Sequence, residues 1–205
     1  MRFLDRWLAL ANWLARRAIW FAGTLMLAAA LLVSVDVLLR KFLLLSVGGA
    51  DELSGYAFAI GTAWALAFTL LQRANVRVDA LYIHLPQAAC AVLDLAAMLS
   101  LGVFVGLLTW QAWVVLDTSL AFDAHATTPL QTPLWIPQLL WLAGLALFAF
   151  TWTPLFLRSL GALFRGDLAY EPPHVGARSI EEDAAAEIAH TEHLEPATHL
   201  EQPAR

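Results

Sequence analysis

The stretch GGADELSGYAFAIGTAWALAFTLL, residues 48–71, decides the fold of this chain. Asp51 and Glu52 stand directly before a run from Leu53 to Leu71 that has no charged residue. A helix needs ~20 mostly apolar residues to cross the hydrocarbon core of a membrane, so this run predicts a membrane-spanning helix. The stretch therefore raises the question of why two carboxylates stand at the entrance of a membrane span.

Helix capping accounts for both acids without a further role. Asp51 is of a residue type that caps helix N-termini, because its side chain accepts hydrogen bonds from free backbone N–H groups. Glu52 then falls in the first turn, at the positive end of the helix dipole. We therefore expect both acids to stabilise the start of this helix.

The composition is that of a membrane protein. Hydrophobic residues make up 60% of the 205 residues and charged residues only 14%, whereas soluble domains carry ~25% charged residues. Residues 1–165 hold ten Lys/Arg and eight Asp/Glu, a charge of +2, and residues 166–205 hold two Arg and nine acids, a charge of −7. A mildly basic membrane body with an acidic tail gives no indication of nucleic-acid binding.

The hydropathy pattern predicts an all-α integral membrane protein with three regions. Residues 1–16 are expected to form an amphipathic arm and residues 166–205 a disordered acidic tail, which has too few apolar residues to form a core. Between them, residues 17–165 are expected to form a four-helix membrane domain. Its predicted spans are residues 18–39, 53–71, 88–116 and 134–157.

The distribution of basic residues predicts the topology. Eight arginines fall in the N-terminal arm, after the second span and after the fourth span, whereas only Arg40 and Lys41 fall in the other loops. Basic residues concentrate on the cytoplasmic side of membrane proteins, so both termini are expected in the cytoplasm. Tryptophans are expected near the membrane interfaces: Trp110, Trp113 and Trp135 at the outer one, Trp20 and Trp152 at the inner one.

The N-terminal arm has two candidate placements. Phe3, Trp7, Leu10 and Leu14 share one helical face, which favours a helix lying in the inner membrane interface. The alternative is a cytoplasmic extension of the first span.

Only two acids lie inside the predicted spans. Asp36 stands four residues before Arg40, so a local ion pair on one helix explains it. Asp94 lies early in the third span, within reach of Arg73 or Arg77. A transport pathway needs polar groups at membrane depth, and neither acid by itself makes one.

Small residues in the second and third spans predict close helix packing. Small residues four positions apart let helix backbones approach in lipid, either within one chain or against another membrane protein. These residues are Ala57, Gly61 and Ala65 in one helix and Gly102 and Gly106 in another.

The sequence lacks the residues that several other classes of function require. None of the six histidines lies within a predicted span, which argues against a haem-carrying electron-transfer subunit. The sequence has no zinc-ligand spacing and no phosphate-binding glycine loop, so neither a cofactor nor an enzymatic activity is expected. A membrane anchor of an electron-transfer enzyme and an independent small channel or carrier stay as alternatives.

Three stretches resemble the small permease subunit of TRAP transporters, the tripartite ATP-independent periplasmic transporters (DctQ-like). The first is RKFLLLSVGGADEL, residues 40–53, in which a basic residue ends one span and an acidic pair opens the next. The second is QRANVRVDAL, residues 72–81, and the third is TTPLQTPLWIP, residues 127–137. The family pattern has His where this sequence has Asn75. The resemblance covers about residues 10–165 and draws attention to Arg73, Arg77 and Asp79.

The resemblance implies a role in a three-part transporter of the bacterial inner membrane. In such a system a periplasmic solute-binding protein delivers an organic acid, and a large permease subunit moves it by sodium symport. The small subunit would act as a membrane scaffold for the large one. On the outer face we expect Arg40, Lys41, Asp51 and Glu52 to form a charged cluster that holds the first loop against the second span and contacts a partner.

Overall fold

Residues 2–72 and 86–164 are described by the computed structural model, and they form four helices. Each helix is long and apolar enough to cross a membrane. Within the described ranges the only β-structure is an isolated antiparallel bridge between His125 and Pro133. The predicted all-α architecture with four spans is therefore confirmed. The helices are α1 (Arg2–Leu43), α2 (Ala50–Leu71), α4 (Gln87–Ala121) and α5 (Trp135–Phe164).

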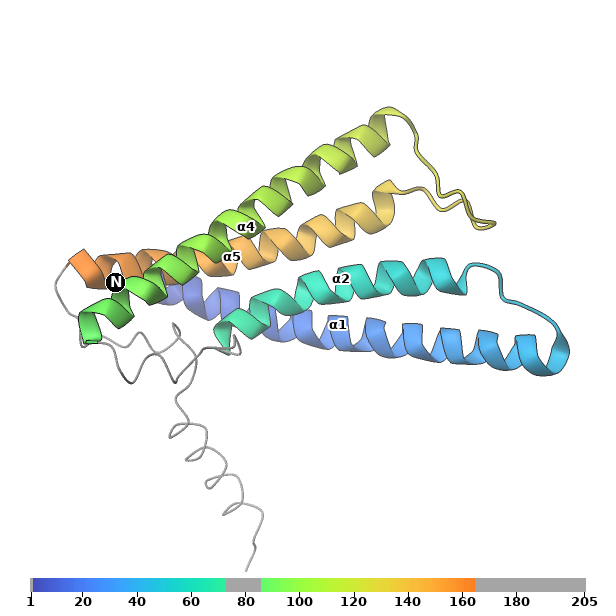
Figure 1. Ribbon diagram of the computed structural model, residues 1–205, viewed down its shortest axis with the longest axis horizontal. Coiled ribbons are helices and arrows are strands. Elements are labelled where there is room, and N and C mark those ends of the chain that lie inside the picture. The colour runs from blue at the N-terminus through green and yellow to red at the C-terminus, as the bar shows by residue number, and fades with distance from the viewer. Residues whose placement is uncertain (1, 73–85, 165–205) are drawn as a thin grey trace, which may run out of the picture.

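The connections fall at two opposite ends of the bundle (Figure 1). The loop of residues 44–49 joins α1 to α2, and residues 122–134, which we call the α4–α5 arm, join α4 to α5 at the same end. We call this the loop end. The beginning of α1 and the end of α5 lie together at the opposite end, which we call the terminal end.

Helix α5 is the centre of the packing. It contacts α1, α2 and α4, whereas α4 packs mainly on α5 and diverges from α1 and α2 in Figure 1. The face that α5 buries follows helical spacing, because residues three and four positions apart share one side. Its buried side chains include Leu145, Phe148, Thr151 and Leu155.

Helix α1 is a single helix of 42 residues, about 63 Å at 1.5 Å per residue. The predicted N-terminal arm is therefore not a separate helix but the first turns of α1, as in the alternative of an extended first span. The placement of these turns in the membrane interface stays a prediction. Within the bundle they bury a second face. It is formed by Leu8, Ala11, Ala15 and Ala18, whereas Leu10 is half exposed. Alanine suits these positions because a small side chain lets α1 approach its neighbours closely.

The chain reverses between α1 and α2 through three residues with left-handed backbone. Leu44 has φ 55°, Gly48 has φ 63° and Gly49 has φ 96°. Two successive glycines tolerate this conformation because they lack a Cβ atom. As a result α2 begins at Ala50 with Gly49 as its N-cap, without a side-chain hydrogen bond at the cap. The prediction that Asp51 caps the helix is therefore wrong, although Asp51 and Glu52 do lie in the first turn.

Candidate functional site

The Glu52 carboxylate joins two separate segments at the loop end. Its Oε1 accepts a hydrogen bond of 2.9 Å from the Tyr56 hydroxyl, and its Oε2 accepts one from the Thr128 hydroxyl. The Thr132 side chain also lies near this carboxylate. Tyr56 is one turn along α2, whereas both threonines belong to the α4–α5 arm. The carboxylate therefore joins the start of α2 to a segment that is 76 residues away in sequence.

Backbone hydrogen bonds within the α4–α5 arm hold the segment that carries these threonines. The Ala126 N–H donates to the Thr132 carbonyl at 2.9 Å, and the Leu134 N–H donates to the Ala124 carbonyl at 3.0 Å. These two backbone hydrogen bonds join the two sides of the arm. The turn between the two sides is closed by a hydrogen bond of 3.1 Å from the Gln131 N–H to the Thr128 carbonyl. These hydrogen bonds fix the backbone of the turn, and the turn carries Thr128.

Leu130 provides an apolar contact between the arm and α2. A Cβ atom added to Gly49 would lie only 1.7 Å from Leu130 Cδ1, so the leucine occupies the space where any other side chain would begin. Two features therefore require glycine at position 49: its positive φ and the close approach of Leu130.

Asp36 organises the neighbouring α1–α2 loop in a similar way. It is 2% exposed and its Oδ1 accepts hydrogen bonds from the Val47 N–H at 2.7 Å and from the Ser46 hydroxyl at 3.0 Å. Its Oδ2 pairs with Arg40, which confirms the predicted local ion pair. The two bonds to the loop were not apparent from sequence, because they depend on how residues 44–49 fold back over α1.

The four residues of the predicted charged cluster belong to separate sets of contacts. Arg40 pairs with Asp36, and Glu52 with the α4–α5 arm. The Lys41 ammonium lies over the Phe42 ring at 5.6 Å, and Asp51 is exposed. No ion pair between described residues joins Arg40 or Lys41 to either acid. A contact of these residues with a partner stays a prediction.

The predicted small-residue positions divide between packed and open sites. A Cβ atom on Gly61 would lie 3.2 Å from Met26 Cγ of α1, and one on Gly102 would lie 2.1 Å from the Trp152 ring of α5. Ala57 is buried and Ala65 is partly buried. Gly106 has nothing within 4 Å of its added Cβ atom, so it does not contribute to packing within the chain.

Two tryptophans link helices in a way that the sequence did not reveal. The Trp64 Nε1–H donates to the Leu140 carbonyl at 2.8 Å, and the Trp152 Nε1–H donates to the Met98 carbonyl at 3.0 Å. Each ring lies against a glycine of the facing helix, Gly144 for Trp64 and Gly102 for Trp152. Trp152 is therefore a partly buried packing residue, and its position at the inner membrane interface stays a prediction.

The first turns of α1 are attached to α5 at the terminal end. The Asp5 carboxylate pairs with Arg158 at 3.3 Å, and the Trp7 and Phe150 rings have their centroids 5.4 Å apart. The sequence did not indicate this docking, because the paired residues Asp5 and Arg158 are 153 positions apart along the chain.

Other predicted features lie outside the described residues. These are Arg73, Arg77 and Asp79 of the family-like turn and the acidic tail from residue 166. Among the residues that the structure describes, no three His, Cys, Asp or Glu side chains gather as a metal site would require.

The fold and its contacts define a class of protein: a multi-pass helical membrane protein whose polar side chains near the loop end hold its own loops. The comparison with protein families then gives the assignment. The model of the DctQ component of the tripartite ATP-independent periplasmic transporters matches residues 29–161, more than half of the chain, and the chain belongs to this family. None of the curated proteins or solved structures compared with the chain matches it.

Family membership makes the chain a small membrane subunit of a TRAP transporter, and this family is one of transporter components. The matched region contains all three stretches that carried the resemblance. The structure adds that two of them touch, because Glu52 of the first bonds to Thr128 of the third.

Proposed function

We propose that this chain is the scaffold of its transporter: it braces the large permease subunit, which takes up an organic acid by sodium symport after delivery by a periplasmic binding protein. The proposal places the chain in the bacterial inner membrane with both termini in the cytoplasm. The sequence supports this orientation through its excess of arginines at the terminal end.

The observation that carries the scaffold proposal is the large apolar surface that the bundle leaves uncovered. Only 11% of the most apolar stretch of α1 and 6% of that of α4 is buried within the chain. Such surface must be covered by lipid or by another membrane protein, and a small subunit that braces a larger one offers surface of this kind.

The contacts of Asp36 weigh against the chain acting as an independent carrier. Its carboxylate is already bound by Arg40, Ser46 and Val47, so it serves the α1–α2 loop. An ion pathway through Asp36 or Asp94 would require uptake to stop when both are changed to Asn. We expect uptake to survive these changes in variants that still fold.

Reconstitution tests the scaffold role directly. The large subunit and the binding protein are placed in proteoliposomes with and without this chain, and uptake of a radiolabelled organic acid is measured with and without a sodium gradient. We expect uptake only in the complete system with sodium. Full uptake without this chain would contradict the proposal.

A second part of the proposal is that a partner contacts the loop end. Charge reversal at Glu52 or Arg40 would disturb internal contacts as well as any docking, because Glu52 binds the α4–α5 arm and Arg40 pairs with Asp36, which binds the α1–α2 loop. Lys41→Glu and Asp51→Lys are better tests, since both side chains are exposed. We expect them to lower the yield of the complex, whereas removal of residues 170–205 should not. Unchanged yields for both reversals would remove the docking role.

A further inference from the structure

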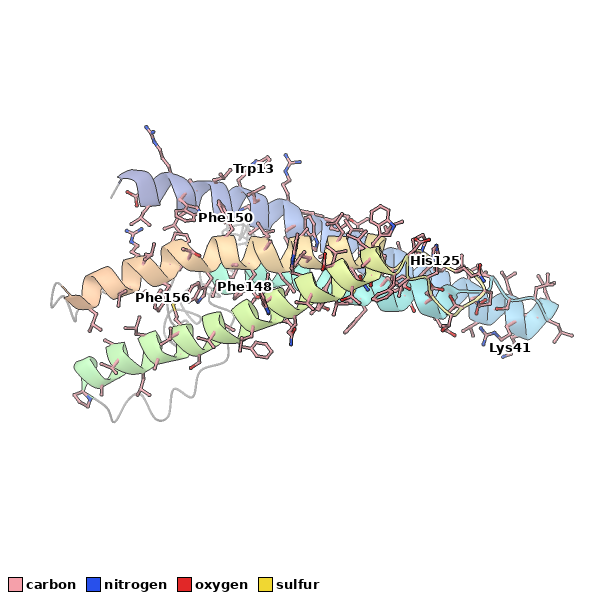
Figure 2. All side chains as sticks on the ribbon, turned by 90° about the horizontal axis from the view of Figure 1, so that it is seen from above. Trp13, Lys41, His125, Phe148, Phe150 and Phe156 are labelled. Carbon is pink, nitrogen blue, oxygen red and sulfur yellow. The ribbon has the colours of Figure 1, made fainter. Side chains whose placement is uncertain are left out.

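One face of α1 near the terminal end carries large and charged side chains that the bundle leaves uncovered. Trp13 is 56% exposed and Trp20 is 78% exposed. Arg16 and Arg17 are also exposed. At 100° per residue Arg16 and Arg17 flank the line through Trp13 and Trp20 on either side. Figure 2 shows Trp13 on this first part of α1, far from Lys41 at the other end of the helix.

Arg17 is held in place by the aromatic ring beside it. Its guanidinium carbon lies 5.5 Å from the centroid of the Trp13 ring. Stacking of this kind leaves the N–H groups at the edge of the guanidinium plane free to bind an anion. Among the described residues neither Arg16 nor Arg17 has an ion pair with an acid.

The depth of these residues follows from the rest of the same face. From Trp20 onward its exposed large side chains are apolar, and they include Leu27, Leu31, Val35 and Leu38. The rise from Trp20 to Leu38 is about 27 Å, close to the ~30 Å of a hydrocarbon core. Trp20 therefore falls at the edge of the hydrocarbon, and Arg17 lies about 4.5 Å beyond it, at the level of lipid phosphates.

We propose that Arg16 and Arg17, framed by Trp13 and Trp20, bind the phosphate of an anionic phospholipid headgroup. Two cations at headgroup depth complement the charge of such a lipid. The tryptophan rings suit the same level because they are apolar with one polar N–H. This site is separate from the loop end, and it does not depend on which solute the transporter carries.

Native mass spectrometry of the full-length chain in detergent provides the test. Phosphatidylglycerol or phosphatidylcholine with the same acyl chains is added, and the bound fraction is measured for each lipid. The wild-type chain should prefer phosphatidylglycerol. Changing both arginines to Gln should lower the apparent affinity for it by about fivefold per arginine, without lowering that for phosphatidylcholine.

Lys41→Gln is the matched control, since Lys41 is also an exposed cation stacked on an aromatic ring, Phe42. It should change phosphatidylglycerol binding by less than about twofold, because the proposed site lies at the other end of α1. All variants should keep the melting temperature of the wild type, which separates lost binding from lost folding.

Three results would overturn the proposal. One is an unchanged lipid preference in the Arg16→Gln/Arg17→Gln variant, and another is an equal loss in Lys41→Gln. The third is a preference that emerges only after removal of residues 170–205, which would assign this face to the acidic tail instead.

Discussion

At the scale of single residues, two carboxylates near the loop end determine where the connecting segments lie. Asp36 binds the α1–α2 loop, and Glu52 binds the α4–α5 arm. A carboxylate suits both places because it accepts several hydrogen bonds at once, and bonds to a charged acceptor are stronger than neutral ones. Asp51, adjacent to Glu52 in sequence, points elsewhere and is exposed, so adjacent acids have different roles.

The contact of Glu52 with Thr128 predicts a measurable coupling between the helix and the arm. Glu52→Ala should lower the apparent melting temperature in detergent by several degrees and speed cleavage of the arm by a protease, because the arm loses its polar anchor. Thr128→Val should have a smaller effect of the same kind. The double variant should lose less than the sum of the two, since both remove one bond.

Asp51→Ala is the control for Glu52→Ala, because it removes an acid from the same first turn without removing a contact with the arm. It should leave arm cleavage unchanged. If the two alanine variants behave alike, or if the effects of Glu52→Ala and Thr128→Val simply add, Glu52 does not anchor the arm.

A series at Asp36 separates its hydrogen bonds from its ion pair. The Arg40 side chain is 58% exposed, and exposed ion pairs contribute little to stability. Arg40→Gln should therefore lower the melting temperature less than Asp36→Ala, which leaves the Val47 N–H without its acceptor. Asp36→Asn retains an acceptor oxygen and should fall between them. A larger loss in Arg40→Gln than in Asp36→Ala would show that the ion pair matters more.

At the scale of helices, close approach depends on glycines that face tryptophans. Trp64 lies against Gly144 between α2 and α5, and Trp152 lies against Gly102 between α5 and α4. In each pair the indole N–H also bonds to a carbonyl of the facing helix. Large and small side chains thus interlock, and the polar end of each ring is satisfied, which favours one helix register over others.

Glycine-to-alanine changes in α4 test this interlocking. Gly102→Ala places a Cβ atom 2.1 Å from the Trp152 ring, so the ring must move, and overpacking of this kind costs about 1–3 kcal/mol. Gly106→Ala in the same helix meets nothing within 4 Å and should be neutral or stabilising by up to about 1 kcal/mol. The free energy of unfolding by denaturant in micelles measures both. Equal effects would show that Gly102 is not a packing position.

At the scale of the whole molecule, side-chain contacts join the helices and loops at both ends of the bundle, and its sides expose broad apolar faces. The α4–α5 arm reaches α2 at the loop end, and Asp5 and Trp7 reach α5 at the terminal end. From the terminal end toward the loop end, α4 diverges from α1 and α2 (Figure 1). An arrangement that is anchored at its ends and exposes broad apolar faces fits a subunit that packs against a larger partner.

The arrangement of the ends makes a prediction about topology. In a chain with Cys90 changed to Ser, single cysteines at Leu45 and Asp123, both exposed at the loop end, should react with a membrane-impermeant thiol reagent added to whole spheroplasts. A cysteine at Arg6, exposed at the terminal end, should react only after the membrane is opened. Reaction of Arg6→Cys from outside would reverse the proposed orientation.

The four membrane helices, the local ion pair of Asp36 and Arg40, and the family could all be predicted from the sequence. These features depend on apolar runs, on spacing within one helix and on short ordered motifs, all of which are local along the chain. The sequence failed at Asp51, because the glycines at 48 and 49 let α2 begin earlier than the acids suggested.

Tertiary structure alone decided which distant residues meet. Glu52 was expected beside Arg40 and Lys41, yet it binds Thr128. Trp7, in the first turns of α1, packs on Phe150 of α5, a contact that the sequence did not indicate. Helical periodicity says which residues share a face, but the partner of that face depends on how the helices are arranged. The sequence therefore shows that a carboxylate can accept hydrogen bonds, but which group donates them depends on the tertiary fold.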